Sequence, residues 1–170
     1  LAPGLSDGQV VLSIVAGARM DTLIDGLKHP AVIRVMPNTP AQIGAGMIVW
    51  TASPDVPKDR VAAGRDILGT LGEELYVSDE KLLDMATALS ASGPAYVFLF
   101  IEALIDAGVY VGMPRDMARK LVLQTVLGST RLVQESGRHP ADLKDSVTSP
   151  GGTTAEALLV FEGEGFRGTV

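Results

Sequence analysis

The 170-residue sequence predicts an α/β region followed by an all-helical region. Up to about residue 78, short apolar, β-branched runs alternate with helical patterns, as in a parallel sheet flanked by helices. From Ser78 onward only helical patterns occur, and the first opens with a capping serine and acidic residues. The sequence therefore predicts two domains, residues 1–78 and residues 79–170.

Four strands are expected in the first domain, at residues 9–16, 31–37, 46–52 and 75–77. The first three are apolar without alternation, which is typical of strands buried on both faces of a parallel sheet. Helices are expected between them at 20–29 and 56–71. So few strands leave a sheet edge unpaired, and neither GxGxxG nor GxxxxGK[ST] occurs in the sequence. We expect that N-terminal strands and their phosphate loop are missing from this chain.

Five helices are expected in the second domain, at residues 79–91, 94–112, 114–136, 140–147 and 153–162. The segment SASGPAY predicts a break between the first two, because Gly93 is followed by a proline that suits a first helical turn. The helix at 94–112 is apolar around most of its circumference, so we expect it to be buried on nearly all sides. A domain this small cannot cover such a helix alone, which predicts a homodimer.

Composition argues against several classes of partner. The net charge is −6 without a basic patch, which argues against binding to nucleic acid or to an anionic membrane. The most apolar stretch contains Glu102 and Asp106, which are costly inside a bilayer. The sequence has no cysteine, and its two histidines are far apart, so no metal site is predicted. With no signal peptide apparent, we expect a cytoplasmic protein.

The segment SPGGTTAEAL at 149–158 predicts a helix that begins behind two glycines. One interpretation is a turn followed by a threonine cap, which spacing alone favours. The other is an anion site, because unpaired N–H groups in a first helical turn attract a carboxylate or phosphate. Gly152 would allow close approach, and Thr153 and Thr154 would offer hydroxyls to a second group of the same ligand.

Two loops of the first domain follow predicted strands. Asn38 lies between two prolines in MPNTP, and Ala16 and Gly17 end the first strand. Ligands of parallel sheets bind at the carboxyl ends of strands, so these loops are candidates for a cofactor site. Taken alone, the Asn-Thr-Pro segment is more simply explained as a turn.

Three segments together resemble the pyrroline-5-carboxylate reductase family: VIRVMPNTPAQIGAGM (32–47), ALSASGPAYVFLFIEALIDAGVYVGMPRDMA (88–118) and HPADLKDSVTSPGGTTAEAL (139–158). The resemblance implies a partial Rossmann-type sheet that binds NADP or NAD and a C-terminal helical dimerisation domain. It also implies an interlocked homodimer, which in this family often builds larger rings. The implied reaction is reduction of 1-pyrroline-5-carboxylate to L-proline, the last step of proline biosynthesis. The family's opening strand and glycine-rich fingerprint are absent here, so the chain resembles the last two-thirds of a member.

The resemblance also implies roles for individual residues. Thr154 matches the catalytic threonine whose hydroxyl meets the ring nitrogen of the substrate. A neutral hydroxyl can donate to this nitrogen without a shifted pKa, and the remaining catalysis would be positioning. The implied substrate-binding residues are Gly152, Thr153, Thr154 and Glu80, and the implied cofactor-binding residues are Ala16, Gly17, Asn38 and Ser146.

Two alternatives remain open from the sequence. The chain could be a non-catalytic dimerisation scaffold, or it could belong to another imine or hydroxyacid dehydrogenase of similar architecture. Hydroxyacid enzymes usually rely on a lysine of the helical domain, and Lys81, Lys120 and Lys144 are not set in such a motif.

Overall fold

A computed structural model of the chain describes residues 4–170. By their internal contacts these residues form two compact units, one ending at Phe100 and the other beginning at Ile101, within a single helix. The elements in chain order are β1 (Val11–Ser13), α1 (Met20–Leu27), β2 (Val32–Met36), η2 (Thr39–Ile43), β3 (Gly46–Ala52), α2 (Lys58–Gly69), β4 (Gly72–Tyr76), α3 (Lys81–Ala86), η3 (Thr87–Ala91), α4 (Gly93–Tyr110), α5 (Arg115–Ser136), α6 (Pro140–Ser146), α7 (Thr153–Gly163) and α8 (Phe166–Thr169).

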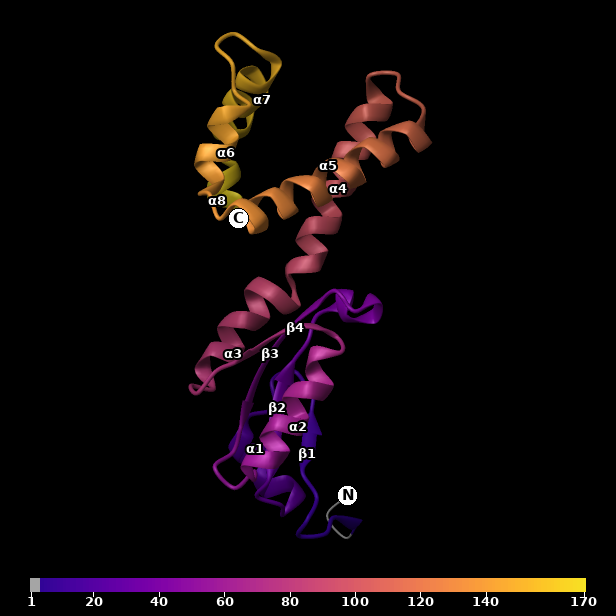
Figure 1. Cartoon of the computed structure of the whole chain (residues 1–170). Coiled ribbons are helices and arrows are strands. Elements are labelled where there is room, and N and C mark those ends of the chain that lie inside the picture. The colour runs from indigo at the N-terminus through magenta and orange to yellow at the C-terminus, as the bar shows by residue number, and fades with distance from the viewer. Residues whose placement is uncertain (1–3) are drawn as a thin grey trace. The chain divides into compact units, whose positions relative to one another are not determined.

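The first unit is built on a four-stranded sheet in the order β1-β2-β3-β4 (Figure 1). Helix α1 connects the parallel pair β1 and β2, and helix α2 connects the parallel pair β3 and β4. Both connections are strand–helix–strand units, so the predicted α/β class is confirmed.

The expectation of a wholly parallel sheet is wrong at its centre, where β2 and β3 run antiparallel. Ile33 pairs with Ala52 and Met36 pairs with Val49. The connection between these strands holds only the short 3₁₀ helix η2, and a parallel crossover needs a dozen or more residues. The short linker therefore forces the chain to turn back, which a local apolar pattern does not reveal.

The main core lies between the sheet and α2. Trp50 and Ile48 of β3, Ile33 of β2 and Leu68 of α2 are all buried in it. Helix α2 packs closely here, because a Cβ added to Gly64 would lie 2.8 Å from Ile33 Cδ1. The opposite face of the sheet is covered by α1 and α3, so this small unit has two helical layers.

The ends of the sheet differ most from the predicted ranges. Strand β1 covers only Val11–Ser13 of the expected 9–16, and the following Ile14 is exposed. Strand β4 begins earlier than expected, at Gly72, where it pairs with Gly46 of β3. Within it, Glu74 accepts a hydrogen bond from Trp50 Nε1 at 2.6 Å. A search for apolar runs does not identify the start of this strand, because the strand contains acidic residues.

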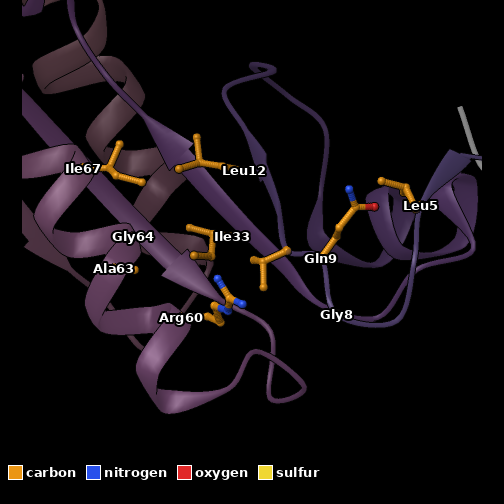
Figure 2. Close-up of a pocket in the computed structure, with 10 residues that line it drawn as sticks. Leu5, Gly8, Gln9, Leu12, Ile33, Arg60, Ala63, Gly64 and Ile67 are labelled. Carbon is orange, nitrogen blue, oxygen red and sulfur yellow. The ribbon is translucent and has the colours of Figure 1, made fainter.

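A groove of about 460 Å³ runs beside β1, where the sheet ends (Figure 2). Leu12 of β1 and Ile67 of α2 line it and remain partly exposed. Among the described residues, β1 pairs with β2 alone. The groove exists because no further strand of residues 4–170 extends the sheet across this face.

The predicted break at SASGPAY is confirmed at Ser92, a bend between the π-helical turn η3 and α4. The N–H of Ser92 donates to the Thr87 carbonyl oxygen at 2.9 Å, five residues back. Pro94 causes no interruption because it lies in the first turn of α4, where its missing N–H is not needed. Residues 81–110 therefore form one helical run that is interrupted at Ser92.

Helix α4 contradicts the expectation of burial, since none of its residues is buried within the chain. Leu99 is 65% exposed, and Phe98 and Val97 are exposed beside it. Length and composition alone would allow the run Lys81–Tyr110 to cross a membrane. The same composition suits a helix that another protein surface covers, because no element of residues 4–170 buries it.

The second unit contains the end of α4 and four further helices. Helices α4 and α5 approach closely, because a Cβ added to Gly108 would lie 3.0 Å from Ala118 Cβ. Arg115 Nη1 lies 2.9 Å from Asp106 Oδ1 across the same pair of helices. The ring of His139 caps α6 by accepting a hydrogen bond from the N–H of Ala141 at 3.1 Å.

Candidate functional site

Three of the predicted cofactor residues lie at one edge of the sheet. Strands β1 and β2 are adjacent and parallel, with Ser13 opposite Arg34, so the loops that follow them leave the same edge. Ala16 and Gly17 lie in the first loop and Asn38 in the second. Gly17 has φ +76°, a conformation that favours glycine, and it exposes backbone at the carboxyl ends of the strands. This edge can accept a flat ring close to main chain.

The side chain of Asn38 already has several partners. Its Oδ1 accepts a hydrogen bond from the N–H of Met47 at 2.9 Å. Its Nδ2 donates to the carbonyl oxygen of Ser90 at 3.3 Å and lies 3.4 Å from Ser90 Oγ. Asn38 therefore ties the loop after β2 to the π turn. Sequence reasoning did not identify Ser90 as its partner, because 52 residues separate the two.

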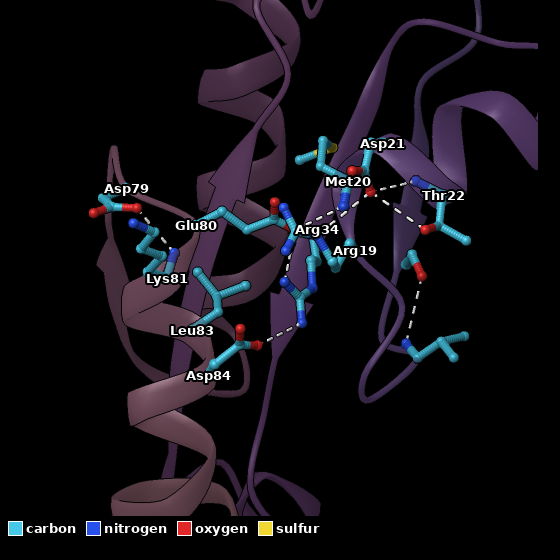
Figure 3. A network of polar contacts seen from close by, with 12 residues as sticks. Arg19, Met20, Asp21, Thr22, Arg34, Asp79, Glu80, Lys81, Leu83 and Asp84 are labelled. Atoms are coloured by element: carbon cyan, nitrogen blue, oxygen red, sulfur yellow. Dashed lines mark hydrogen bonds and ion pairs between the residues drawn. The ribbon is translucent and has the colours of Figure 1, made fainter.

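Glu80, predicted to bind substrate, lies at the start of α3 in a polar network (Figure 3). Its Oε1 accepts hydrogen bonds from the N–H of Met20 at 2.6 Å and from Arg34 Nη1 at 2.6 Å. Arg34 Nη2 donates to Asp84 Oδ1 at 3.1 Å. The neighbouring Asp79 instead accepts from the N–H of Lys81 at 3.0 Å, so of these two adjacent acids it is Glu80 that contacts Arg34.

Arg34 is the residue that sequence reasoning missed. Its side chain is only 1% exposed, and it stands in the middle of the central strand β2. A charged residue within the apolar run AVIRVMP is a signal of a buried ion pair, since a buried charge needs a partner. The sequence alone does not identify the partner of Arg34, because Glu80 is 46 residues away along the chain.

An ionised carboxylate lies beside this network, on the exposed first turn of α1. The backbone N–H of Thr22 donates to Asp21 Oδ1 and lowers the pKa of Asp21 below its ordinary value, with a smaller contribution from the nearby Arg19. A negative charge here also suits the positive end of the α1 dipole.

The remaining predicted residues lie in the second unit, around the start of α7. Gly152 is the N-cap, with extended backbone, and no side chain among the described residues caps this helix. The threonine-cap interpretation is therefore wrong, since Thr153 is already the first helical residue. The N–H groups of Thr153 and Thr154 lie in the first turn, where an α-helix provides no acceptor.

The backbone ahead of α7 is shaped by two glycines and a serine. Gly151 has φ +68°, and the N–H of Gly152 donates to the Ser149 carbonyl oxygen at 3.0 Å. A Cβ added to Gly152 would lie 2.5 Å from Ser149 Oγ. A side chain at 152 would force Ser149 to shift, and the Gly152 N–H is already engaged in the turn.

Ser146 ends α6 in the same unit, seven residues before α7. Its Oγ donates to the Leu143 carbonyl oxygen at 2.7 Å, and the residue is exposed. Each unit therefore gathers its own set of predicted residues. The first set is Ala16, Gly17, Asn38 and Glu80, and the second is Ser146, Gly152, Thr153 and Thr154. Their individual roles stay predictions.

The chain was compared with known proteins and structures. The family model "Pyrroline-5-carboxylate reductase dimerisation" matches residues 80–170. The pyrroline-5-carboxylate reductase of Synechocystis sp. is 47% identical over 98% of this chain and 62% of its own length. That of Escherichia coli (strain K12) is 44% identical over 100% of this chain and 63% of its own length. The chain thus spans about 62% of the length of such curated relatives.

Solved structures agree with this result. The crystal structure of Plasmodium falciparum pyrroline carboxylate reductase with NADP bound has a TM-score of 0.93 and 38% identity, covering 99% of this chain and 67% of that one. A 1-pyrroline-5-carboxylate reductase from Streptococcus pyogenes has a TM-score of 0.89 and 37% identity, covering 95% of this chain and 62% of that one. None of these relatives is a scaffold or a hydroxyacid dehydrogenase by name. The chain belongs to the pyrroline-5-carboxylate reductase family.

Proposed function

We propose that the protein reduces 1-pyrroline-5-carboxylate to L-proline with NADPH or NADH, as the last step of proline biosynthesis. One observation carries this proposal: the start of α7 has no side-chain cap, and it presents first-turn N–H groups together with two threonine hydroxyls. A small ring that bears a carboxylate and a nitrogen matches this arrangement of donors. The relatives supply the class of substrate through their names.

The substrate's carboxylate would accept hydrogen bonds from the first-turn N–H groups of Thr153 and Thr154. The positive end of the α7 dipole stabilises a carboxylate at this position. Gly152 has its N–H engaged, so its contribution would be close approach of the ligand to bare backbone. The hydroxyl of Thr154 would donate to the imine nitrogen as that nitrogen gains electron density, which makes it the proposed catalytic residue.

The proposed cofactor residues are Ala16, Gly17, Asn38 and Ser146. The exposed turn at Gly17 fits a nicotinamide ring, because little side chain blocks the backbone there. Asn38 would act by holding its loop, since its amide is engaged with Met47 and Ser90. The bound cofactor supplies the hydride, and NADP is the form bound in the Plasmodium falciparum relative. No cluster of three metal-ligating side chains occurs among residues 4–170.

The proposed partner is a second copy of the chain. Helix α4 leaves large apolar side chains exposed, and it lies within the residues that match the family's dimerisation region. Covering such a face with a second copy removes apolar surface from water. A larger ring of dimers is the proposed higher assembly, and the cytoplasm is the proposed compartment.

A chimaera tests this function at full length. Residues 1–170 replace the matching region of the Escherichia coli relative, with which they align over their whole length. Loss of NADPH absorbance on addition of pyrroline-5-carboxylate measures the reaction. We expect turnover, and we expect Thr154→Ala to lower kcat/KM by about 10–100-fold, the effect of one lost hydrogen bond to a reacting group.

Thr154→Ser is the matched control, because it keeps the hydroxyl and should retain most of the activity. A chimaera that is folded and dimeric but leaves NADPH unoxidised would contradict the proposed reaction. A folded Thr154→Ala variant with an unchanged rate would remove the hydroxyl from the mechanism.

A further inference from the structure

We infer that the ion pair between Arg34 and Glu80 is a positioning device that anchors the loop of residues 14–19 to helix α3. Glu80 would act on the cofactor through this loop, and it would make no contact with substrate. The inference rests on the proposed function, because it assigns the loop to the cofactor. It gives Glu80 a role different from the one that the family resemblance implies.

The anchor is a backbone contact at the end of the loop. The loop leaves β1 after Ser13 and ends where α1 begins at Met20. An α-helix leaves its first N–H groups without internal acceptors, and Arg19 at the N-cap provides no side-chain acceptor. Glu80, 60 residues further along the chain, accepts the Met20 N–H at 2.6 Å (Figure 3).

Arg34 fixes the position of that carboxylate. Its buried guanidinium has two ionic partners, Glu80 Oε1 at 2.6 Å and Asp84 Oδ1 at 3.1 Å. Arg34 Nε finds no hydrogen-bond partner among residues 4–170, so within this part of the chain the charge relies on these two contacts. Asp84 is mostly exposed, whereas Glu80 is largely covered. A buried charge is costly without its counter-ion, which makes the Glu80 side chain hard to displace.

The same helical segment holds both loops at the edge of the sheet. Glu80 at the start of α3 holds the loop that contains Ala16 and Gly17. Ser90, in the π turn after α3, accepts the hydrogen bond from Asn38 in the loop after β2. Both contacts join segments that are far apart in the sequence. Residues 80–90 therefore set the spacing of the two loops that the proposed cofactor site uses.

Hydrogen exchange of the 170-residue chain tests the anchor directly and needs neither cofactor nor activity. We expect Glu80→Ala to increase exchange at the Met20 amide at least 10-fold, because the amide loses its charged acceptor. Glu80→Gln keeps an acceptor oxygen and should give a smaller increase. Leu68→Ala, which destabilises the same unit from the other face of the sheet, is the control for general loosening. Equal exchange at Met20 in the wild-type and Glu80→Ala chains would overturn the anchor.

Binding and kinetics of the chimaera test the consequence for the ligands. We expect Glu80→Ala to raise the Kd for NADPH about 10-fold, which corresponds to about 1.4 kcal/mol, and to leave the KM for the imine within about twofold. Leu68→Ala should leave the Kd for NADPH nearly unchanged. The reverse pattern, a raised KM for the imine with an unchanged Kd for NADPH, would assign Glu80 to the substrate and overturn the inference.

The two tests fail in different ways. A wild-type chimaera that neither binds NADPH nor reduces the imine would overturn the proposed function and, with it, the cofactor role of the loop. The exchange measurement would still decide whether Glu80 holds Met20.

Discussion

The two units of this chain differ in how they bury apolar side chains. The sheet unit has a core of its own, in which Trp50, Ile48 and Leu68 are almost completely inaccessible to solvent. In contrast, α4 and α7 have no buried residue, and α5 buries only Ala118. Helices as apolar as α4 gain stability by packing rather than by propensity. The difference indicates that the first unit is stabilised by its own contacts and that the helical region needs a further surface to cover it, which the proposed second copy would supply.

The largest expected effect comes from the core of the sheet unit. Trp50→Ala should destabilise this unit by about 3–5 kcal/mol, because it removes the largest buried side chain and leaves Glu74 without the indole N–H. Urea unfolding followed by circular dichroism measures the loss. If the unit is stabilised by its own contacts, the loss should be the same at every protein concentration. A loss that shrinks as the concentration rises would contradict its independence.

A smaller but still large effect is expected on the exposed face of α4. Leu99→Asp should raise the dissociation constant of the proposed dimer about 100-fold or more, because a charge would enter its proposed apolar interface. Analytical ultracentrifugation measures this constant. Ile43→Asp is the matched control, since Ile43 is even more exposed but belongs to η2 in the sheet unit. Equal effects of the two substitutions on the dissociation constant would contradict the assignment of the interface to α4.

The smallest effect is expected at the turn before α7. Gly152→Ala should lower kcat/KM of the chimaera by about 10-fold, because its Cβ would meet Ser149 Oγ at 2.5 Å and shift the first-turn N–H groups. Removing that oxygen with Ser149→Ala in the same chain should restore most of the activity. A double variant as slow as Gly152→Ala alone would show that the contact with Ser149 is not the cause.

Local sequence patterns identified best those elements whose ends are marked by glycine or proline. Strand β3 matches the expected residues 46–52, and helices α5 and α6 begin and end within a residue of their predicted limits. The antiparallel direction of β3 was missed, because it depends on the pairing of strands and on a short linker. The exposure of α4 was missed, because burial depends on what covers a helix and not on the helix alone.

The candidate site was predictable to a similar extent. The residues at strand ends and at the start of α7 could be selected from turn and helix chemistry. Their partners could not, because Asn38 meets Ser90 and Glu80 meets Arg34 across about 50 residues of chain. The charge of Arg34 within an apolar run was a signal of a buried ion pair that sequence reasoning missed, and only the fold identifies Glu80 as its partner. Family resemblance supplied the roles, which neither spacing nor geometry assigns.

The π turn at Thr87–Ala91 also controls the phase of the helix that follows it. One additional residue rotates every later side chain of an α-helix by about 100°. The aromatic residues near the start of α4 therefore face a different direction from the one a regular continuation of α3 would give them. Deleting a single residue within 87–91 would preserve the composition of α4. It would rotate α4 about its axis, so that a different set of its side chains faces a given direction. The stripe available for the proposed self-association thus depends on a stretch of small residues that lies ahead of α4.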